Sequence, residues 1–106
     1  LFDAVTAVSG SGPAYLYMVI EAMADAGVRE GLSRASALEL AAQTALGSAK
    51  MVLESGLHPA ALRDMVCSPG GTTIDAVCTL EEKGLRAAVE SAVRVCAEKS
   101  RAMSKQ

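Results

Sequence analysis

The residue types that could bind a ligand are concentrated in the segment Ser68-Pro69-Gly70-Gly71-Thr72-Thr73, between two stretches with helical spacing. Its two glycines allow backbone conformations that other residues resist, and its proline stiffens the approach. The N–H groups of Gly71, Thr72 and Thr73 would lack intrahelical acceptors at the start of the next helix, at the positive end of its dipole. Such groups, with two hydroxyls beside them, suit a carboxylate or a phosphate. Spacing alone leaves an anion-binding loop and an ordinary capped helix start equally open.

Other motifs predict less. No Lys follows the two glycines, so the loop is not a nucleoside-triphosphate loop. The stretch "AVTAVSGSGPAY" imitates a dinucleotide fingerprint, but Tyr15 stands where a third small residue is needed and Pro13 removes an N–H. Ser9 and Ser11 could be nucleophiles only with a base. The single histidine, His58, lies at a helix start and is interpreted as an exposed turn residue, so a hydrolytic triad is not expected.

Composition narrows the class of protein. The 106 residues suit one domain, with 51% hydrophobic and 3% aromatic residues, a formal net charge of −2 and no basic block, which disfavours nucleic acid as a partner. Three cysteines and one histidine make neither a disulfide framework nor a metal site, and they favour a reducing cytoplasm. No signal peptide is visible, and the longest apolar stretch, Ala14 to Ile20, is too short to span a membrane, so no membrane partner is expected.

Helix-start and helix-stop residues predict an all-α chain. Five helices are expected: Pro13 to about Arg29, from behind Ser33 to Gly56, a short one from Pro59, one capped by Thr72 or Thr73 that stops at Gly84, and Leu85 to about Met103. Gly47 lies inside the second helix, where glycine costs roughly 1 kcal/mol against alanine, so we expect another backbone to approach closely there.

The two long N-terminal helices are apolar on several sides. Within the first, a narrow stripe of charge at Glu21, Asp25 and Arg29 leaves most of the circumference apolar. Five short elements cannot cover this much apolar surface, so we expect a second copy of the chain to cover it through a large hydrophobic interface. The alternative is a self-contained five-helix bundle with an unusually apolar core.

Two motifs together resemble one family. "AVTAVSGSGPAY" and "LRDMVCSPGGTTIDAV" are similar to the C-terminal domain of pyrroline-5-carboxylate reductase, over essentially all 106 residues. The resemblance implies a five-helix domain like the C-terminal domain of 6-phosphogluconate dehydrogenase. Two copies would form an interlocked dimer, which assembles further in many members. It also implies a Rossmann domain, expected before residue 1 and outside this chain, that carries NADPH or NADH. Hydride would pass to the imine of 1-pyrroline-5-carboxylate and give L-proline.

The resemblance also assigns residues by position. Ser68, Gly70, Gly71, Thr72 and Thr73 would hold the substrate carboxylate, with the Thr73 hydroxyl close to the ring nitrogen. Thr6, ahead of the first helix, would approach the nicotinamide or the ring, so the implied catalytic residues are Thr73 and Thr6. Some relatives carry Asn at the position of Met65 and an acidic residue at that of Gly56, and their polar contacts are not expected here.

No histidine, cysteine or metal is required for this reaction. A protonated imine is already electrophilic, so positioning and charge complementarity should supply most of the acceleration. A second hypothesis stays open, in which the chain is a non-catalytic helical dimerisation module and its Pro-Gly-Gly loop is a capped turn. A G-x-G-x-x-G or G-x-G-x-x-A fingerprint upstream in the parent reading frame would favour the reductase.

Overall fold

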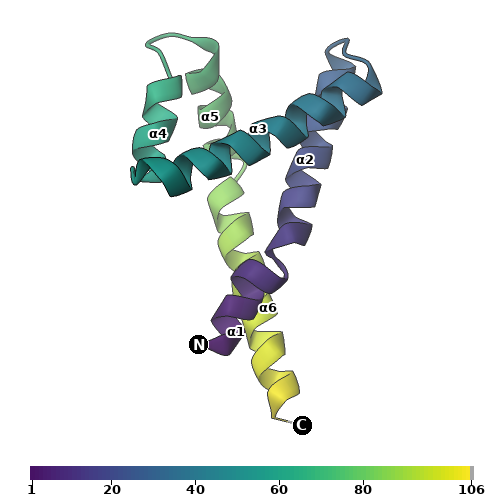
Figure 1. Cartoon of the computed structure of the whole chain (residues 1–106), viewed down its shortest axis with the longest axis vertical. Coiled ribbons are helices and arrows are strands. Elements are labelled where there is room, and N and C mark those ends of the chain that lie inside the picture. Colours follow the sequence, from purple (N-terminus) through teal and green to yellow (C-terminus); the bar gives the residue numbers. More distant parts are fainter. Residues whose placement is uncertain (106) are drawn as a thin grey trace. The chain divides into compact units, whose positions relative to one another are not determined.

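The computed structural model describes residues 1–105, and they are almost entirely helical (Figure 1). No β-strand occurs in this range. The helices are α1 (Phe2–Val5), the π-helix η1 (Thr6–Gly10), α2 (Gly12–Arg29), α3 (Arg34–Ser55), α4 (Pro59–Val66), α5 (Thr72–Glu82) and α6 (Leu85–Ser104). The predicted all-α class and its five helices are confirmed as α2 to α6. The two short segments α1 and η1 were not predicted. No helix within residues 1–105 has the length and apolar character to span a membrane.

Most helix ends follow from their local residues. The Ser33 hydroxyl accepts a hydrogen bond from the Ser36 N–H at 3.2 Å and begins α3, and α3 ends at Gly56 in the left-handed conformation. The expected cap at Thr72 or Thr73 is wrong. Because α5 begins at Thr72 itself, both threonines belong to its first turn.

His58 has a more definite role than the exposed turn residue that the sequence suggested. Its Nδ1 accepts a hydrogen bond from the Ala60 N–H at 3.0 Å, and Pro59 occupies the first helical position after it. His58 is thus the N-cap of α4, a position where Ser, Thr, Asp or Asn is usually found. The cap therefore fixes the beginning of α4, the helix that leads into the Ser68–Thr73 loop.

The chain divides into two compact units. The terminal unit comprises Leu1–Tyr17 and the chain from Cys78 onward, and the central unit comprises Met18–Val77. In the terminal unit, α1 and η1 pack against each other and against α6 (Figure 1). The Ser100 hydroxyl donates a hydrogen bond to Asp3 Oδ1 at 2.6 Å, which ties α1 to α6.

The central unit has a small core where α2 meets α3. Ala24, Ala37 and Ala41 are buried there, with partly buried aliphatic side chains from α2 packed against them. The close approach falls at Gly27, where a Cβ would lie 3.3 Å from the Ala37 Cβ. At Gly47, where a close approach was expected, a Cβ would meet no atom of this chain within 4 Å.

One chain buries very little apolar surface. Within residues 1–105 every buried apolar side chain is an alanine, namely Ala7, Ala24, Ala37, Ala41 and Ala97. The large apolar side chains of α2 stay open, with Leu16 at 56%, Met18 at 69% and Met23 at 47% exposure. Exposed apolar surface on this scale marks interaction sites in folded proteins. The cover that α2 requires is therefore not supplied by the chain itself.

The cap at α4 makes a testable prediction. Replacing His58 by Ala removes the acceptor for the Ala60 N–H, so the free energy of unfolding should fall by about 1 kcal/mol. Chemical denaturation measures the loss. The His58→Asp variant restores a capping acceptor and should recover most of it. Equal stability of the Ala and Asp variants would show that the cap contributes nothing.

Candidate functional site

The Ser68–Gly71 segment forms a closed turn between α4 and α5. The Gly71 N–H donates a hydrogen bond to the Ser68 carbonyl at 3.0 Å. Pro69 and Gly70 are the two central residues, and Gly70 has a φ of 68°. Proline followed by a residue with positive φ is the signature of a type II β-turn, in which glycine avoids backbone strain. The chain therefore breaks here in a defined conformation.

Gly71 is needed for a different reason, namely space. A Cβ at this position would lie 2.3 Å from the Ser68 Oγ and 3.3 Å from the Ser68 carbonyl oxygen. Any larger residue would displace the Ser68 hydroxyl. The two glycines thus have different roles. Gly70 adopts the positive φ of the turn, and Gly71 leaves room for the Ser68 side chain beside the start of α5.

The turn corrects one part of the expected anion site. The Gly71 N–H was expected to be free for a ligand, but the Ser68 carbonyl accepts it, because the type II turn closes through that bond. The N–H groups of the first helical residues, including Thr72 and Thr73, lack intrahelical acceptors by the geometry of an α-helix. They lie at the positive end of the eleven-residue helix α5. An anion here would meet these two N–H groups.

The side chains of the loop differ in exposure. Ser68 and Thr72 are exposed, and Thr73 is half-buried. Asp75, in the first turn of α5, also places a negative charge near the helix start and has an interaction of its own. The loop itself carries no positive side chain. Backbone N–H groups and hydroxyls are thus what Ser68–Thr73 can offer an anion.

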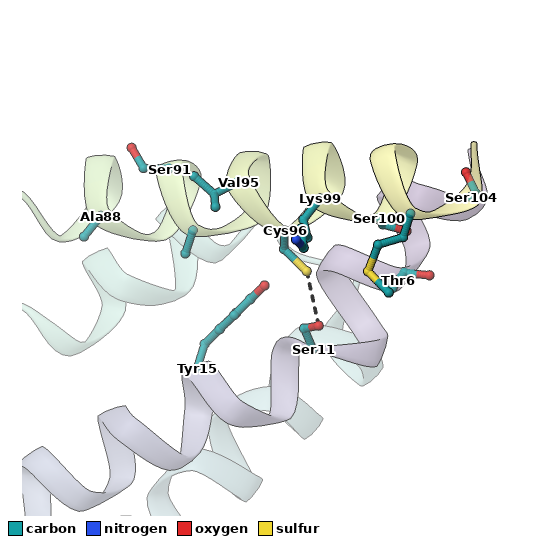
Figure 2. A pocket seen from close by; sticks show the side chains of 12 residues that line it. Thr6, Ser11, Tyr15, Ala88, Ser91, Val95, Cys96, Lys99, Ser100 and Ser104 are labelled. Atoms are coloured by element: carbon teal, nitrogen blue, oxygen red, sulfur yellow. Dashed lines mark hydrogen bonds between the residues drawn. The ribbon is translucent and has the colours of Figure 1, made fainter. Parts of the chain in front are cut away.

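Thr6, the other expected site residue, belongs to the terminal unit, whereas Ser68–Thr73 lies in the central unit. Within the central unit the loop residues form one turn and helix start, and within the terminal unit Thr6 is the first residue of the π-helix η1. Thr6 is exposed and lines a groove of about 1040 Å³ with Ser11, Tyr15 and residues of α6 (Figure 2).

The floor of this groove holds a polar cluster that the sequence did not indicate. The Tyr15 hydroxyl donates a hydrogen bond to the Ala7 carbonyl at 2.8 Å. The Cys96 thiol donates to the Ser11 hydroxyl at 3.2 Å (Figure 2). Loss of hydration and the neighbouring Cys96 thiol raise the pKa of the Tyr15 phenol above 10.0, its ordinary value. The sequence had marked Tyr15 only as a residue that spoils a nucleotide fingerprint.

The described residues do not fit a dinucleotide cofactor. The stretch that imitates the fingerprint, residues 4–15, forms α1, η1 and the start of α2, with no strand ahead of its glycines. A dinucleotide fingerprint needs a strand, a tight glycine turn and then a helix. Within residues 1–105 no group of three or more His, Cys, Asp and Glu side chains could hold a metal ion.

The Gly71 contact makes a second testable prediction. Gly71→Ala should lower the free energy of unfolding, because the new Cβ displaces the Ser68 hydroxyl. In a Ser68→Ala background that hydroxyl is absent, so the same change should cost less, with a coupling of roughly 0.5–1 kcal/mol in a double-mutant cycle. Gly70→Ala is the matched control: its cost comes from positive φ and should be equal in both backgrounds. If the losses in free energy of unfolding from Gly71→Ala and Ser68→Ala were additive, a contact between position 71 and the Ser68 hydroxyl would be contradicted.

Comparison with known proteins places the chain in a family. A family model described as pyrroline-5-carboxylate reductase dimerisation matches residues 1–103. The chain is 65% identical over 101 residues to the pyrroline-5-carboxylate reductase of Escherichia coli, covering 95% of this chain and 38% of the relative. It is 58% identical over 106 residues to that of Methanosarcina acetivorans, covering all of this chain and 39% of the relative.

Solved structures agree with the sequence comparison. The Plasmodium falciparum pyrroline carboxylate reductase with NADP bound matches with a TM-score of 0.92 at 44% identity, over 96% of this chain and 39% of that one. The Streptococcus pyogenes enzyme matches with a TM-score of 0.92 at 46% identity, over 95% and 39%. The chain thus spans about two fifths of the length of these relatives. It belongs to the pyrroline-5-carboxylate reductase dimerisation family.

Proposed function

We propose that this chain is the dimerisation and substrate-binding part of a reductase. The whole enzyme would transfer a hydride from NADPH or NADH to the imine of 1-pyrroline-5-carboxylate and release L-proline. The observation that carries the proposal is the family match over residues 1–103, with 65% identity to a relative named as this reductase. The non-catalytic module is the weaker hypothesis, because the matched relatives bear the name of an enzyme.

The Ser68–Thr73 loop is our proposed site for the substrate carboxylate. The donors that the loop offers include the N–H groups of Thr72 and Thr73 and the hydroxyls of Ser68, Thr72 and Thr73. Backbone N–H groups at a helix start bind carboxylates without an added positive charge. The half-buried Thr73 hydroxyl is proposed to lie beside the ring nitrogen. Gly70 and Gly71 contribute by holding the turn rather than by donating to the ligand.

The cofactor is proposed to lie on a separate domain. Residues 4–15 are helical and lack the strand that a dinucleotide fingerprint needs. The NADP named for the Plasmodium falciparum relative supports a nicotinamide cofactor for the whole enzyme. Thr6, exposed on η1, is proposed to contact the nicotinamide or the substrate ring. The reducing cytoplasm expected from the three cysteines stays a prediction.

A homodimer is our proposed state of the chain. The family description names dimerisation, and the large apolar side chains of α2 lie open in a single copy. Gly47 and Met51 line an apolar groove of about 550 Å³ between α3 and α4, with room for side chains of another copy. Further assembly of dimers, implied by the resemblance, stays a prediction.

The proposed dimer can be tested on the 106-residue chain. We expect sedimentation equilibrium at micromolar concentration to give the mass of a dimer, because obligate interfaces bury large apolar areas. The same preparation should not reduce 1-pyrroline-5-carboxylate with added NADPH, since it lacks a dinucleotide fingerprint. A stable monomer would contradict the first expectation, and cofactor-dependent turnover would contradict the second.

The proposed role of Thr73 can be tested in the complete enzyme. Thr73→Val keeps the shape and the β-branch but removes the hydroxyl. A hydrogen bond to a charged partner is worth roughly 1.5–3 kcal/mol, so kcat/KM should fall about tenfold to a hundredfold. The KM for the cofactor should barely change, because the loop is proposed to face the substrate.

The matched control is Thr73→Ser, which restores the hydroxyl and should recover most of the kcat/KM. Steady-state kinetics and thermal melting are measured on the same preparations. If Thr73 acts only in helix stability, Thr73→Val will lower the melting temperature and leave kcat/KM unchanged. That outcome would remove Thr73 from the proposed site.

A further inference from the structure

The π-helix η1 ends in an unusual hydrogen-bonding pattern. The Ser11 N–H bonds to the Thr6 carbonyl at 2.9 Å, an i to i+5 bond. In an α-helix this N–H would instead bond to the carbonyl of Ala7. Pro13, two residues further on, has no N–H, so the Ser9 carbonyl also lacks its α-helical partner. The Ala7 carbonyl therefore loses its α-helical partner at the place where the chain turns from η1 into α2.

Tyr15 supplies a replacement partner. Its hydroxyl donates to the Ala7 carbonyl at 2.8 Å, across eight residues of sequence. Ala7 is fully buried, so its carbonyl is poorly placed to recruit water instead. The Tyr15 phenol is a donor at physiological pH because the ordinary pKa of tyrosine lies near 10.0, and loss of hydration and the Cys96 thiol raise this pKa further.

One contact with α6 and one hydrogen bond within the N-terminal segment also hold the junction between η1 and α2. The Cys96 thiol of α6 donates to the Ser11 hydroxyl at 3.2 Å (Figure 2). The Ser9 hydroxyl donates back to the Val5 carbonyl at 2.9 Å. Thr6 is the residue immediately before Ala7, and its own carbonyl closes the i to i+5 bond. The residue whose carbonyl Tyr15 bonds is thus joined by one peptide bond to the residue that closes the π-turn. Single π-turns of this kind occur frequently at functional sites.

We propose that Tyr15 is a positioning residue, whose hydrogen bond to the Ala7 carbonyl holds η1 in the conformation that presents Thr6. This inference rests on the proposed function, in which Thr6 contacts the nicotinamide or the substrate ring. Tyr15 itself makes no contact with substrate or cofactor in the proposal. Its hydroxyl acts through the backbone of η1.

The test is a double-mutant cycle in the complete enzyme. Thr6→Val removes the proposed catalytic hydroxyl, and Tyr15→Phe removes the positioning hydroxyl while keeping the ring. Each single change should lower kcat by roughly threefold to tenfold, the range for one lost hydrogen bond. In the double variant kcat should be no lower than in Thr6→Val alone, because Tyr15 acts through Thr6. Tyr17→Phe is the matched control: Tyr17 lies on the same helix with 68% exposure, and the change should leave kcat unaltered.

A readout of η1 itself accompanies the kinetics. Hydrogen exchange of the Ser11 amide reports opening of the bond to Thr6, and it should speed up in Tyr15→Phe and not in Tyr17→Phe. The inference would be overturned if the loss of kcat in the double variant equalled the product of the two single losses. An unchanged kcat in Tyr15→Phe would also overturn it. An unchanged kcat in Thr6→Val would overturn it together with the proposed role of Thr6. Absence of 1-pyrroline-5-carboxylate reduction by the unaltered enzyme would instead refute the proposed function.

Discussion

The structure depends on apolar surface that one chain does not cover. Its buried apolar side chains within residues 1–105 are all alanines, and alanine removes little area from water. The leucine and methionine side chains of α2 stay exposed at about half or more of their area. Burying such a side chain contributes about 1.5–3 kcal/mol. The stabilising burial must therefore come largely from outside the chain, which gives the proposed homodimer its physical basis.

Small local interactions fix the geometry of both candidate regions. In the central unit, the bond from the Gly71 N–H to the Ser68 carbonyl closes the turn and leaves the α5 N–H groups at the proposed carboxylate site. In the terminal unit, the Tyr15 hydroxyl replaces a lost helical bond at Ala7. Each is a break in regular helix structure, closed by a specific bond. Such breaks allow an all-helical chain to present polar groups, because an uninterrupted helix satisfies its N–H and C=O groups internally.

The proposed chemistry needs few special side chains. The described residues offer no cluster suited to a metal, and the loop offers N–H groups and hydroxyls in place of a positive charge. An imine that is already electrophilic is accelerated mainly by being held against its hydride donor. A domain rich in alanine, with a single histidine, is compatible with that task.

The sequence by itself determined the five helices α2 to α6 and the family. Ser33, Gly56 and Pro59 mark helix boundaries through interactions within a few residues, so their effect could be predicted without a fold. The Pro-Gly-Gly turn was recognised for the same reason, because Gly70 at positive φ is a local requirement. The motifs at residues 4–15 and 62–77 were sufficient to indicate the family that the comparisons confirm.

Only the tertiary structure decided how particular atoms are used. It assigned the Gly71 N–H to the Ser68 carbonyl, and it placed the close helix approach at Gly27 and not, within this chain, at Gly47. It also showed that η1 exists and that Tyr15 is bonded to Ala7. No propensity or spacing rule indicates these contacts. They depend on where a side chain or a neighbouring helix lies once the chain has folded, and residue types alone do not specify that position.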